Sequence, residues 1–287
     1  MASLIHNRRF GATWLRPLLG NRMAVMGLAL FIAIVLALVA APLLTPFSPT
    51  RLSLASRLQP PLGVHLLGTD DLGRDLFARL LHAGRTSLLV SLMVVVLAVV
   101  LGVTMGVMAG FFKRLDGPIA RLTDAMMAFP DVLLAISLVA ALGPSTTNVV
   151  IALGIVYAPR VARVVRASTL IIRQLTYVEA AIALGVSTPR IVVRHVLRNL
   201  TSPILVQATF IFANAMLAEA GLSFLGVGTS PDVPTWGAMI NEARTYADQA
   251  PWVLVTPGLA VVAAVLSLQL LGDGLRDILD PKLRKDM

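Results

Sequence analysis

Six apolar runs dominate this chain of 287 residues and restrict the folds open to it. Each run has about 20 to 24 residues, which is enough for a helix to cross the ~30 Å apolar core of a bilayer. Helices are required, because a backbone in lipid finds no hydrogen-bond partner outside its own segment. The sequence therefore predicts an all-α, polytopic membrane helix bundle with six transmembrane helices near residues 23–44, 87–110, 119–142, 148–167, 204–225 and 252–271.

The composition agrees with a membrane protein. Charged residues make up 14% of the chain, whereas an ordinary soluble domain has about 25%. The net charge of +9 is confined to segments between apolar runs, so a membrane accounts for it better than nucleic acid does. The chain has no cysteine, which excludes disulfides and thiolate metal sites. We expect a tail at 1–22 and one transmembrane domain at 23–287.

The first apolar run is predicted to be an uncleaved span. A cleaved signal peptide is the alternative, but the run has the length of a full span. Val39-Ala40-Ala41 is a weak cleavage site, and Pro42 would sit at the cut bond. Four arginines and no acid precede the run, namely Arg8, Arg9, Arg16 and Arg22.

The distribution of basic residues predicts the orientation. Eighteen of the 24 lysines and arginines lie in the first tail, in 111–121, in 160–198 and after residue 271, whereas six lie in 45–86 and 226–251. Short loops rich in lysine and arginine stay in the cytoplasm. We therefore expect cytoplasmic N- and C-termini, a cytoplasmic loop at 168–203, and outer loops at 45–86 and 226–251.

The loop at 168–203 groups small residues and helix breakers. Its small residues are Ala180, Ala181 and Ala183. They favour a helix that packs closely against a partner, and Gly185 can end that helix. Pro189 suits the first turn of a second helix. The candidate N-caps of that helix are Ser187 and Thr188. Spacing alone leaves two readings open, a projecting helix–break–helix knob and a solvated amphipathic loop.

Several strings resemble one known family. Glu179-Ala180-Ala181, followed by Gly185, resembles the EAA loop of ABC-transporter permeases. Four further strings resemble the second permease of peptide and nickel importers, in the same order: HLLGTDDLGRD at 65–75, LSFLGVG at 222–228, WGAM at 236–239, and LGDGLRD at 271–277 with Asp280-Pro281. One position departs, because Arg198 stands where the family usually has proline. The last helix of the loop is therefore expected to run on more smoothly.

The resemblance assigns a role to the cytoplasmic loop. It implies that the loop docks into a groove of an ATPase subunit, so that ATP hydrolysis moves the bundle by alternating access. The residues it implies for this coupling loop are Glu179, Ala180, Ala181, Gly185, Val186, Ser187, Thr188, Pro189 and Arg190.

The resemblance also implies partners and a location. The chain would be a transport subunit in a bacterial inner membrane, paired with a second homologous permease, two ATPase subunits and a substrate-binding protein. ATP and Mg would sit on the ATPase subunits, and this chain would hold neither cofactor nor metal. The sequence lacks a Gly-Lys pair, hence a P-loop. Short peptides are the expected cargo, nickel or another small solute is the alternative, and an ion-coupled secondary transporter is the alternative class.

Polar residues within the apolar runs are candidates for a translocation path. Charged and polar groups at membrane depth serve function or pair with one another. The candidates are Asp131, Gln207, Asn214 and Glu219. Hydrogen bonding between helices is the alternative role, and Asp124 is a further acid near the predicted inner interface.

The outer string HLLGTDDLGRD offers a candidate docking face for a binding protein. The residues of that face are Asp70, Asp71, Arg74, Asp75 and, from the second outer loop, Trp236. The alternative is a structural loop in which Arg74 and Arg79 pair with the acids. A metal loop is disfavoured, because the EF-hand spacing is absent.

Overall fold

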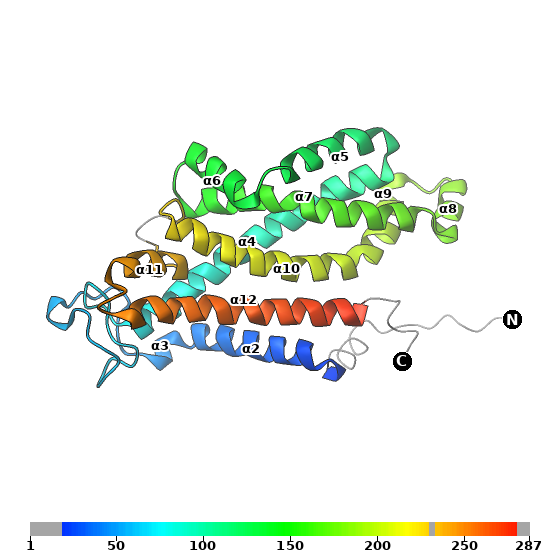
Figure 1. Ribbon diagram of the computed structural model, residues 1–287. Coiled ribbons are helices and arrows are strands. Elements are labelled where there is room, and N and C mark those ends of the chain that lie inside the picture. Colours follow the sequence, from blue (N-terminus) through cyan, green and yellow to red (C-terminus); the bar gives the residue numbers. More distant parts are fainter. Residues whose placement is uncertain (1–18, 230–232, 280–287) are drawn as a thin grey trace.

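The computed structural model describes residues 19–229 and 233–279, and helices make up most of that part (Figure 1). Asp280-Pro281 and most of the tail at 1–22 lie outside the described residues. The helices that are long and apolar enough to span a membrane are α2 (Arg22–Val39), α4 (Leu76–Phe111), α7 (Thr146–Arg173), the continuous run Thr188–Phe224, and α12 (Pro251–Leu279). The predicted all-α membrane bundle is confirmed.

The sixth expected span is broken rather than straight. Residues 119–142 fall in α5 (Lys113–Met127) and α6 (Asp131–Leu142), which meet at 93°. Pro130 immediately precedes α6, and a proline disfavours helical backbone at the residue before it. The predicted continuous helix is therefore wrong here, although the pair together has the composition of one span.

Helix α4 also starts earlier than its apolar run. We expected residue 87, but the helix begins at Leu76, because the Asp75 carboxylate accepts a hydrogen bond from the Ala78 amide (2.7 Å) and caps it. Its 36 residues extend about 54 Å at 1.5 Å per residue, well beyond the bilayer core. The first outer loop correspondingly shortens to 45–75.

The two ends of the bundle carry different structures (Figure 1). One end holds the loop 45–75, with α3 (Ala41–Leu44) and η1 (Leu54–Ser56), and the short helices α11 (Trp236–Ala243) and η3 (Arg244–Tyr246). The other end holds α8 (Thr176–Ala183) and α9 (Thr188–Ile191), with the start of α2 and the end of α12. We call these the outer end and the inner end, after the sides that the charge distribution predicts.

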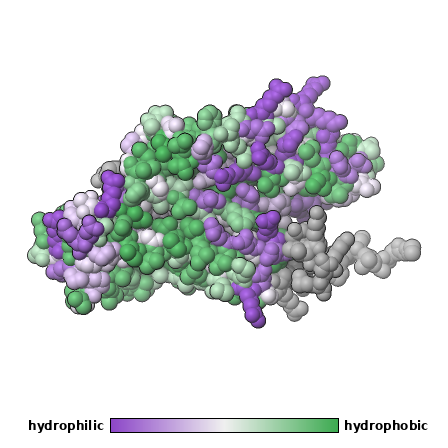
Figure 2. All heavy atoms as spheres, viewed as in Figure 1, coloured by the Kyte–Doolittle hydropathy of each residue, from purple (hydrophilic) through white to green (hydrophobic). Residues whose placement is uncertain are grey.

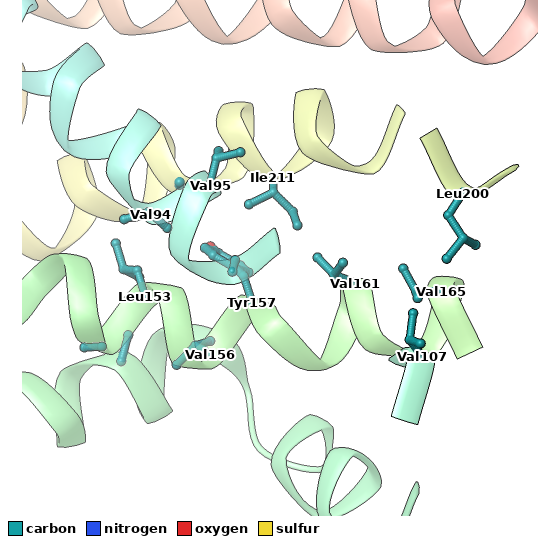
Figure 3. Close-up of a cluster of buried hydrophobic side chains, with 14 of the residues drawn as sticks. Val94, Val95, Val107, Leu153, Val156, Tyr157, Val161, Val165, Leu200 and Ile211 are labelled. Carbon is teal, nitrogen blue, oxygen red and sulfur yellow. The ribbon is translucent and has the colours of Figure 1, made fainter. Parts of the chain in front are cut away.

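The main core lies between α4, α7 and α10 (Arg198–Phe224). Figure 3 shows valines of α4 and α7 packed around Tyr157, with Ile211 and Leu200 contributed by α10. Every fourth residue of α4 is glycine where α7 crosses it. A Cβ at Gly102 would lie 2.4 Å from that of Val161, and Gly106 and Gly110 are equally tight. The glycines thus let the two backbones approach, as a small-xxx-small series predicts.

A second core builds the outer end around Trp236, Met216 and Leu268, from α11, α10 and α12. Beside it α2 packs along α12, where a Cβ at Gly27 would lie 2.6 Å from the amide nitrogen of Leu271. The side of α2 away from α12 exposes large apolar residues such as Met26 and Leu36. Figure 2 shows a broad apolar surface over the middle of the molecule, which suits contact with lipid.

Candidate functional site

The inner loop forms two short helices at an angle beyond the end of α7. Two residues, 174–175, separate α7 from α8, and four residues, 184–187, separate α8 from α9. Figure 1 shows α8 projecting past the ends of the long helices. The loop thus has the helix–break–helix form of the predicted knob.

Gly185 ends α8 with a specific hydrogen-bond pattern. Its backbone φ is +74°, and its amide donates to the Ile182 carbonyl (3.0 Å). The Val186 amide donates to the Ala181 carbonyl, also at 3.0 Å. Together these bonds form a Schellman motif, which satisfies carbonyls at the end of a helix and favours glycine at the left-handed position. The predicted role of Gly185 as helix terminator is confirmed.

Helix α8 divides into a buried side and an exposed tip. Val178 is fully buried and Ala181 is 9% exposed, and both belong to the main core. Ile182 and Leu184 point away from it, with Leu184 83% exposed. Glu179 and Ala180 are also exposed. Apolar side chains gathered at an exposed tip are typical of a contact with another protein.

The second half of the loop continues into the membrane. Ser187 occupies the N-cap position of α9, without a side-chain bond to the helix, and Thr188 and Pro189 lie in its first turn with Arg190 exposed. A π-helical stretch, η2 (Val192–Leu197), then leads directly into α10. Arg198 begins α10 without a break, as we expected from the absence of proline.

Helix α10 presents two faces at membrane depth. Gln207 and Asn214 are seven residues apart, nearly two full turns, and share one face. Gln207 lines an open groove of about 850 Å³ between α7, α10 and α12, together with Ser168, Asn199 and others. Asn214 is exposed, with its amide donating to the Phe210 carbonyl (2.8 Å). Both predicted path residues therefore lie on an open surface of this chain.

Glu219 lies on the other face of α10 and is fully buried. Its carboxylate accepts hydrogen bonds from the hydroxyls of Ser223 (2.8 Å) and Ser87 (3.4 Å). The Ser87 hydroxyl in turn accepts a bond from the Trp236 amide (3.1 Å). The prediction that Glu219 lines a path is not supported by this structure. The carboxylate instead joins α4, α10 and the start of α11.

Asp131 belongs to a set of ion pairs that sequence reasoning missed. It pairs with Arg160 of α7, and two pairs follow toward the inner end, Asp124–Arg163 (2.8 Å) and Asp116–Arg166 (3.0 Å). We call these three pairs the charge ladder. The arginines recur every third residue, which places them along one side of α7. That spacing was visible in the sequence, but their partners lie 29 to 50 residues away.

The outer end contains a buried ion-pair network. Asp70 is 1% exposed and accepts hydrogen bonds from the guanidinium groups of Arg74 and Arg79, both at 2.6 Å. Glu242 of α11 accepts from the same two arginines at 2.9 Å. The predicted pairing of Arg74 and Arg79 with the acids is present. The network ties the first outer loop to the second.

Three residues of the predicted docking face are buried. Asp70 belongs to the network, and Asp75, 4% exposed, caps α4 and accepts a bond from His65 (2.8 Å). Trp236 is 2% exposed and donates its indole N–H to the Leu80 carbonyl (2.9 Å). These side chains hold the outer end together rather than presenting a surface. The order of polar and apolar residues in a loop does not indicate which of its side chains are buried.

Asp71 remains partly exposed beside the network. Partial burial raises the pKa of its carboxyl above the ordinary value, and the neighbouring charge of Asp70 adds to the rise. Asp70, Asp71 and Glu242 place their oxygens close enough to hold a cation. Arg74 and Arg79 already occupy that position and balance the negative charge, so the cluster fits an ion-pair network better than a metal site.

The fold and the inner knob define a class of protein before any comparison is made: a polytopic helical membrane protein with a helix–break–helix projection on one side. The sequence model described as "Binding-protein-dependent transport system inner membrane component" matches residues 98–285, about two thirds of the chain. A second, described as "N-terminal TM domain of oligopeptide transport permease C", matches residues 10–61. The chain belongs to the family of binding-protein-dependent transport system inner membrane components.

Named relatives cover nearly the whole chain. A putative peptide transport system permease protein of Brucella abortus is 46% identical, over 94% of this chain and 92% of the relative. A dipeptide transport system permease protein of Alkalihalophilus pseudofirmus is 42% identical, over 92% and 87%. A glutathione transport system permease protein of Pectobacterium atrosepticum is 42% identical, over 78% and 75%. The resemblance inferred from the EAA loop is confirmed.

Proposed function

We propose that this chain is a transmembrane permease subunit of an ATP-driven importer of short peptides. The family assignment supports a transport subunit, and relatives named for peptide, dipeptide and glutathione transport support a peptide-like cargo. Glutathione is itself a small peptide. Nickel and ion-coupled secondary transport have no comparable support among these relatives.

The observation that carries the proposal is the exposed apolar tip of the inner knob. Leu184 is 83% exposed and Ile182 45%, on a loop whose own backbone bonds are satisfied by the Schellman motif. Apolar side chains gathered at a projecting tip are typical of a surface that another protein covers. An ATPase subunit is the partner we propose for it, and Gly185 supplies the turn that shapes the loop.

The rest of the assembly follows from the same proposal. A second, related permease completes the path, two ATPase subunits bind ATP and Mg at the inner end, and a substrate-binding protein delivers the cargo at the outer end. The bacterial inner membrane is the proposed location. Asp71 and neighbouring exposed loop residues, rather than the buried Trp236, are the part of the outer end able to meet a binding protein.

The proposed path runs along the open face of α10. Gln207 and Asn214 share this face, and the groove beside Gln207 opens toward the inner end. Polar groups at membrane depth that are open in a single chain face water or protein rather than lipid. The knob, the groove and α10 are continuous through α9 and η2, so a movement of the knob reaches the path along one helix.

Leu184→Gln tests the proposed docking role. The tip is exposed, so the substitution leaves the chain folded and inserted, whereas co-purification of the ATPase subunits should be lost. Leu62→Gln is the matched control, since Leu62 is 75% exposed in the outer loop. Normal ATPase binding and normal dipeptide uptake in the Leu184 variant would contradict the proposal.

Single cysteines test the orientation on which the proposal depends. The chain has no native cysteine, so Leu62→Cys and Leu184→Cys each create one reactive thiol. An impermeant thiol reagent on intact cells should label position 62 and leave position 184 unlabelled. The opposite pattern would invert the topology and remove the knob from the ATPase side.

A further inference from the structure

The charge ladder is the principal polar attachment of the broken span to the rest of the bundle. Its three pairs join α5 and α6 to α7 along much of their length, and the Asn148 side chain of α7 adds a hydrogen bond to the Leu142 carbonyl at the end of α6 (2.8 Å). Arg160 is held additionally by Tyr157, whose ring lies 5.4 Å from the guanidinium carbon. The three pairs therefore lie on the side of α7 that α5 and α6 cover only in part.

The ladder lies on the spanning helix α7 and not in the cytoplasmic loop. Without its three arginines the basic residues still number fifteen on the inner side against six on the outer side, so the predicted orientation is unchanged. Arg160 is fourteen residues from the start of α7 and thirteen from its end. At 1.5 Å per residue it is about 20 Å from either end, close to the middle of the bilayer. Arg166, two rungs further, is about 10 Å from the inner end. The three pairs thus descend from the midplane toward the inner interface.

The ladder is too exposed to face lipid. The side chains of the middle pair, Arg163 and Asp124, are 54% and 66% exposed, and those of the outer rungs are exposed to about a third. Charged groups at this depth face water or protein, because exposure to hydrocarbon is costly. Figure 2 shows hydrophilic residues gathered over α5 and the inner half of α7, between apolar surfaces.

Two features favour a watery path over a dry subunit contact. The open groove of about 850 Å³ lies on the neighbouring side of α7, where Val164 directly follows Arg163. The broken half-span α5 carries further exposed charges, among them Lys113, Arg114 and Arg121. A dry interface would leave these charges without solvent, which is unfavourable.

We propose that the charge ladder lines the inner half of the translocation path and contacts the charged ends of a zwitterionic short peptide. The inference rests on the proposed function as a peptide permease and goes beyond it by naming the residues and the charge of the cargo. Each rung offers a carboxylate to the peptide ammonium and a guanidinium to the peptide carboxylate. The rungs balance, so a zwitterion exchanges partners from rung to rung without a net field holding it.

Arg163→Gln tests the proposal by unbalancing the most exposed rung. Asp124 remains as a lone acid, so uptake of an acidic dipeptide should fall relative to a basic one. Uptake of each should change by up to about fivefold, downward for the acidic and upward for the basic dipeptide, the factor expected for one unit charge lost about 4 Å from a charged ligand in water. Arg22→Gln, which makes the same charge change on the far side of the bundle at the start of α2, should leave the ratio unchanged.

The alternative occupant of this surface is the second permease. If the ladder lies in a dry contact with it, Arg163→Gln should lower co-purification of that subunit and reduce uptake of all dipeptides equally. That result would overturn the proposal. The double variant Arg163→Asp with Asp124→Arg restores the pair, and assembly as well as a near-normal ratio should return.

Water access can be measured without any substrate. Arg163→Cys should react with an impermeant thiol reagent added to the solution outside inside-out vesicles that hold the full complex, because their cytoplasmic side faces that solution. Val262→Cys, at an exposed apolar position of α12, should not react. An unreactive thiol at 163 would overturn the ladder proposal even if peptides are transported. If position 163 reacts but the wild-type complex transports no dipeptide, the proposed peptide cargo is wrong, whereas the charge ladder is still accessible to water.

Discussion

The outer and inner ends of this molecule are stabilised in different ways. At the outer end, residues more than 160 positions apart meet in a buried network, with Arg79 bonded both to Asp70 and to Glu242. At the inner end, α8 projects with Leu184 exposed, and one side-chain hydrogen bond, Asn199 to Tyr177 (3.0 Å), crosses its base. The outer end is tied together by buried ion pairs, whereas the inner end projects a knob whose tip is apolar and exposed.

The comparison shows which interactions stabilise each end. Buried ion pairs fix the outer end because removal of any one partner leaves an unpaired buried charge. The inner knob is held by the backbone bonds at Gly185, by the Asn199–Tyr177 bond and by the buried side of α8. Its tip stays available to a partner. A rigid outer end and an open inner end suit a protein that meets its driving partner at the inner end.

The largest effect expected is from Asp70→Ala at the outer end. The change leaves Arg79, a buried guanidinium, with Glu242 as its remaining partner, and breaking such a buried network costs about 3–5 kcal/mol. The melting temperature of the purified chain in detergent should fall sharply. Asp248→Ala, at an exposed position nearby, is the control and should change little. Equal stability of the two variants would remove the contrast between the ends.

Gly185→Val should have a smaller effect on stability and a specific effect on coupling. A Cβ there would meet no other atom, so the cost comes from the left-handed backbone alone, about 1–2 kcal/mol. The chain should insert normally while ATPase co-purification is lost. Gly185→Asn, which tolerates this conformation, should retain binding. Loss of binding in both variants, or in neither, would show that the backbone geometry is not what matters.

The two faces of α10 provide a test of intermediate size. Glu219→Gln replaces a buried carboxylate that accepts two hydroxyl bonds, and should cost about 1 kcal/mol of stability, with transport by the assembled complex unchanged. Gln207→Ala should do the reverse, slowing transport without lowering the melting temperature. A well-assembled Glu219→Gln complex that fails to transport would return Glu219 to the path.

The sequence predicts the local features of this molecule better than the distant ones. Gly185 and Pro189 carry their roles in their own chemistry, and the glycine series from Gly102 anticipates close packing against a neighbouring helix. The cap at Asp75 was also readable, as a short polar residue ahead of a helical run. From the apolar run alone, the start of that helix was predicted eleven residues too late in the sequence.

Pairs between distant segments could not be predicted. Arg160 and Asp131 are 29 residues apart in the sequence, and Arg79 and Glu242 are 163 apart. A single sequence, read without an alignment of its relatives, gives no sign that these residues meet. The 93° bend has a visible cause in Pro130, but its angle depends on how α5 and α6 rest on α7. The burial of Glu219 depends on which face of α10 points into the bundle. A run that is apolar on all sides does not indicate that face.

Asp71→Asn should have the smallest effect, with the opposite sign to Asp70→Ala. Partial burial is the main cause that raises the pKa of Asp71 above 3.8. Repulsion by Asp70 and Glu242 adds to the rise, and attraction by Arg74 opposes it. A raised carboxyl pKa means that the folded state prefers the protonated form. That contribution to stability is present below the unfolded pKa and is lost as the pH rises through the folded pKa.

At neutral pH, therefore, ionised Asp71 slightly opposes folding, and Asp71→Asn should raise the melting temperature by the equivalent of less than about 1 kcal/mol, since the site is partly exposed. The gain should shrink as the pH is lowered and wild-type Asp71 takes up its proton. Melting curves of both chains in detergent across pH 4 to 7 measure this difference. A variant less stable than wild type at pH 7 would show that the Arg74 contact outweighs the repulsion, and that Asp71 belongs to the supporting network rather than to its rim.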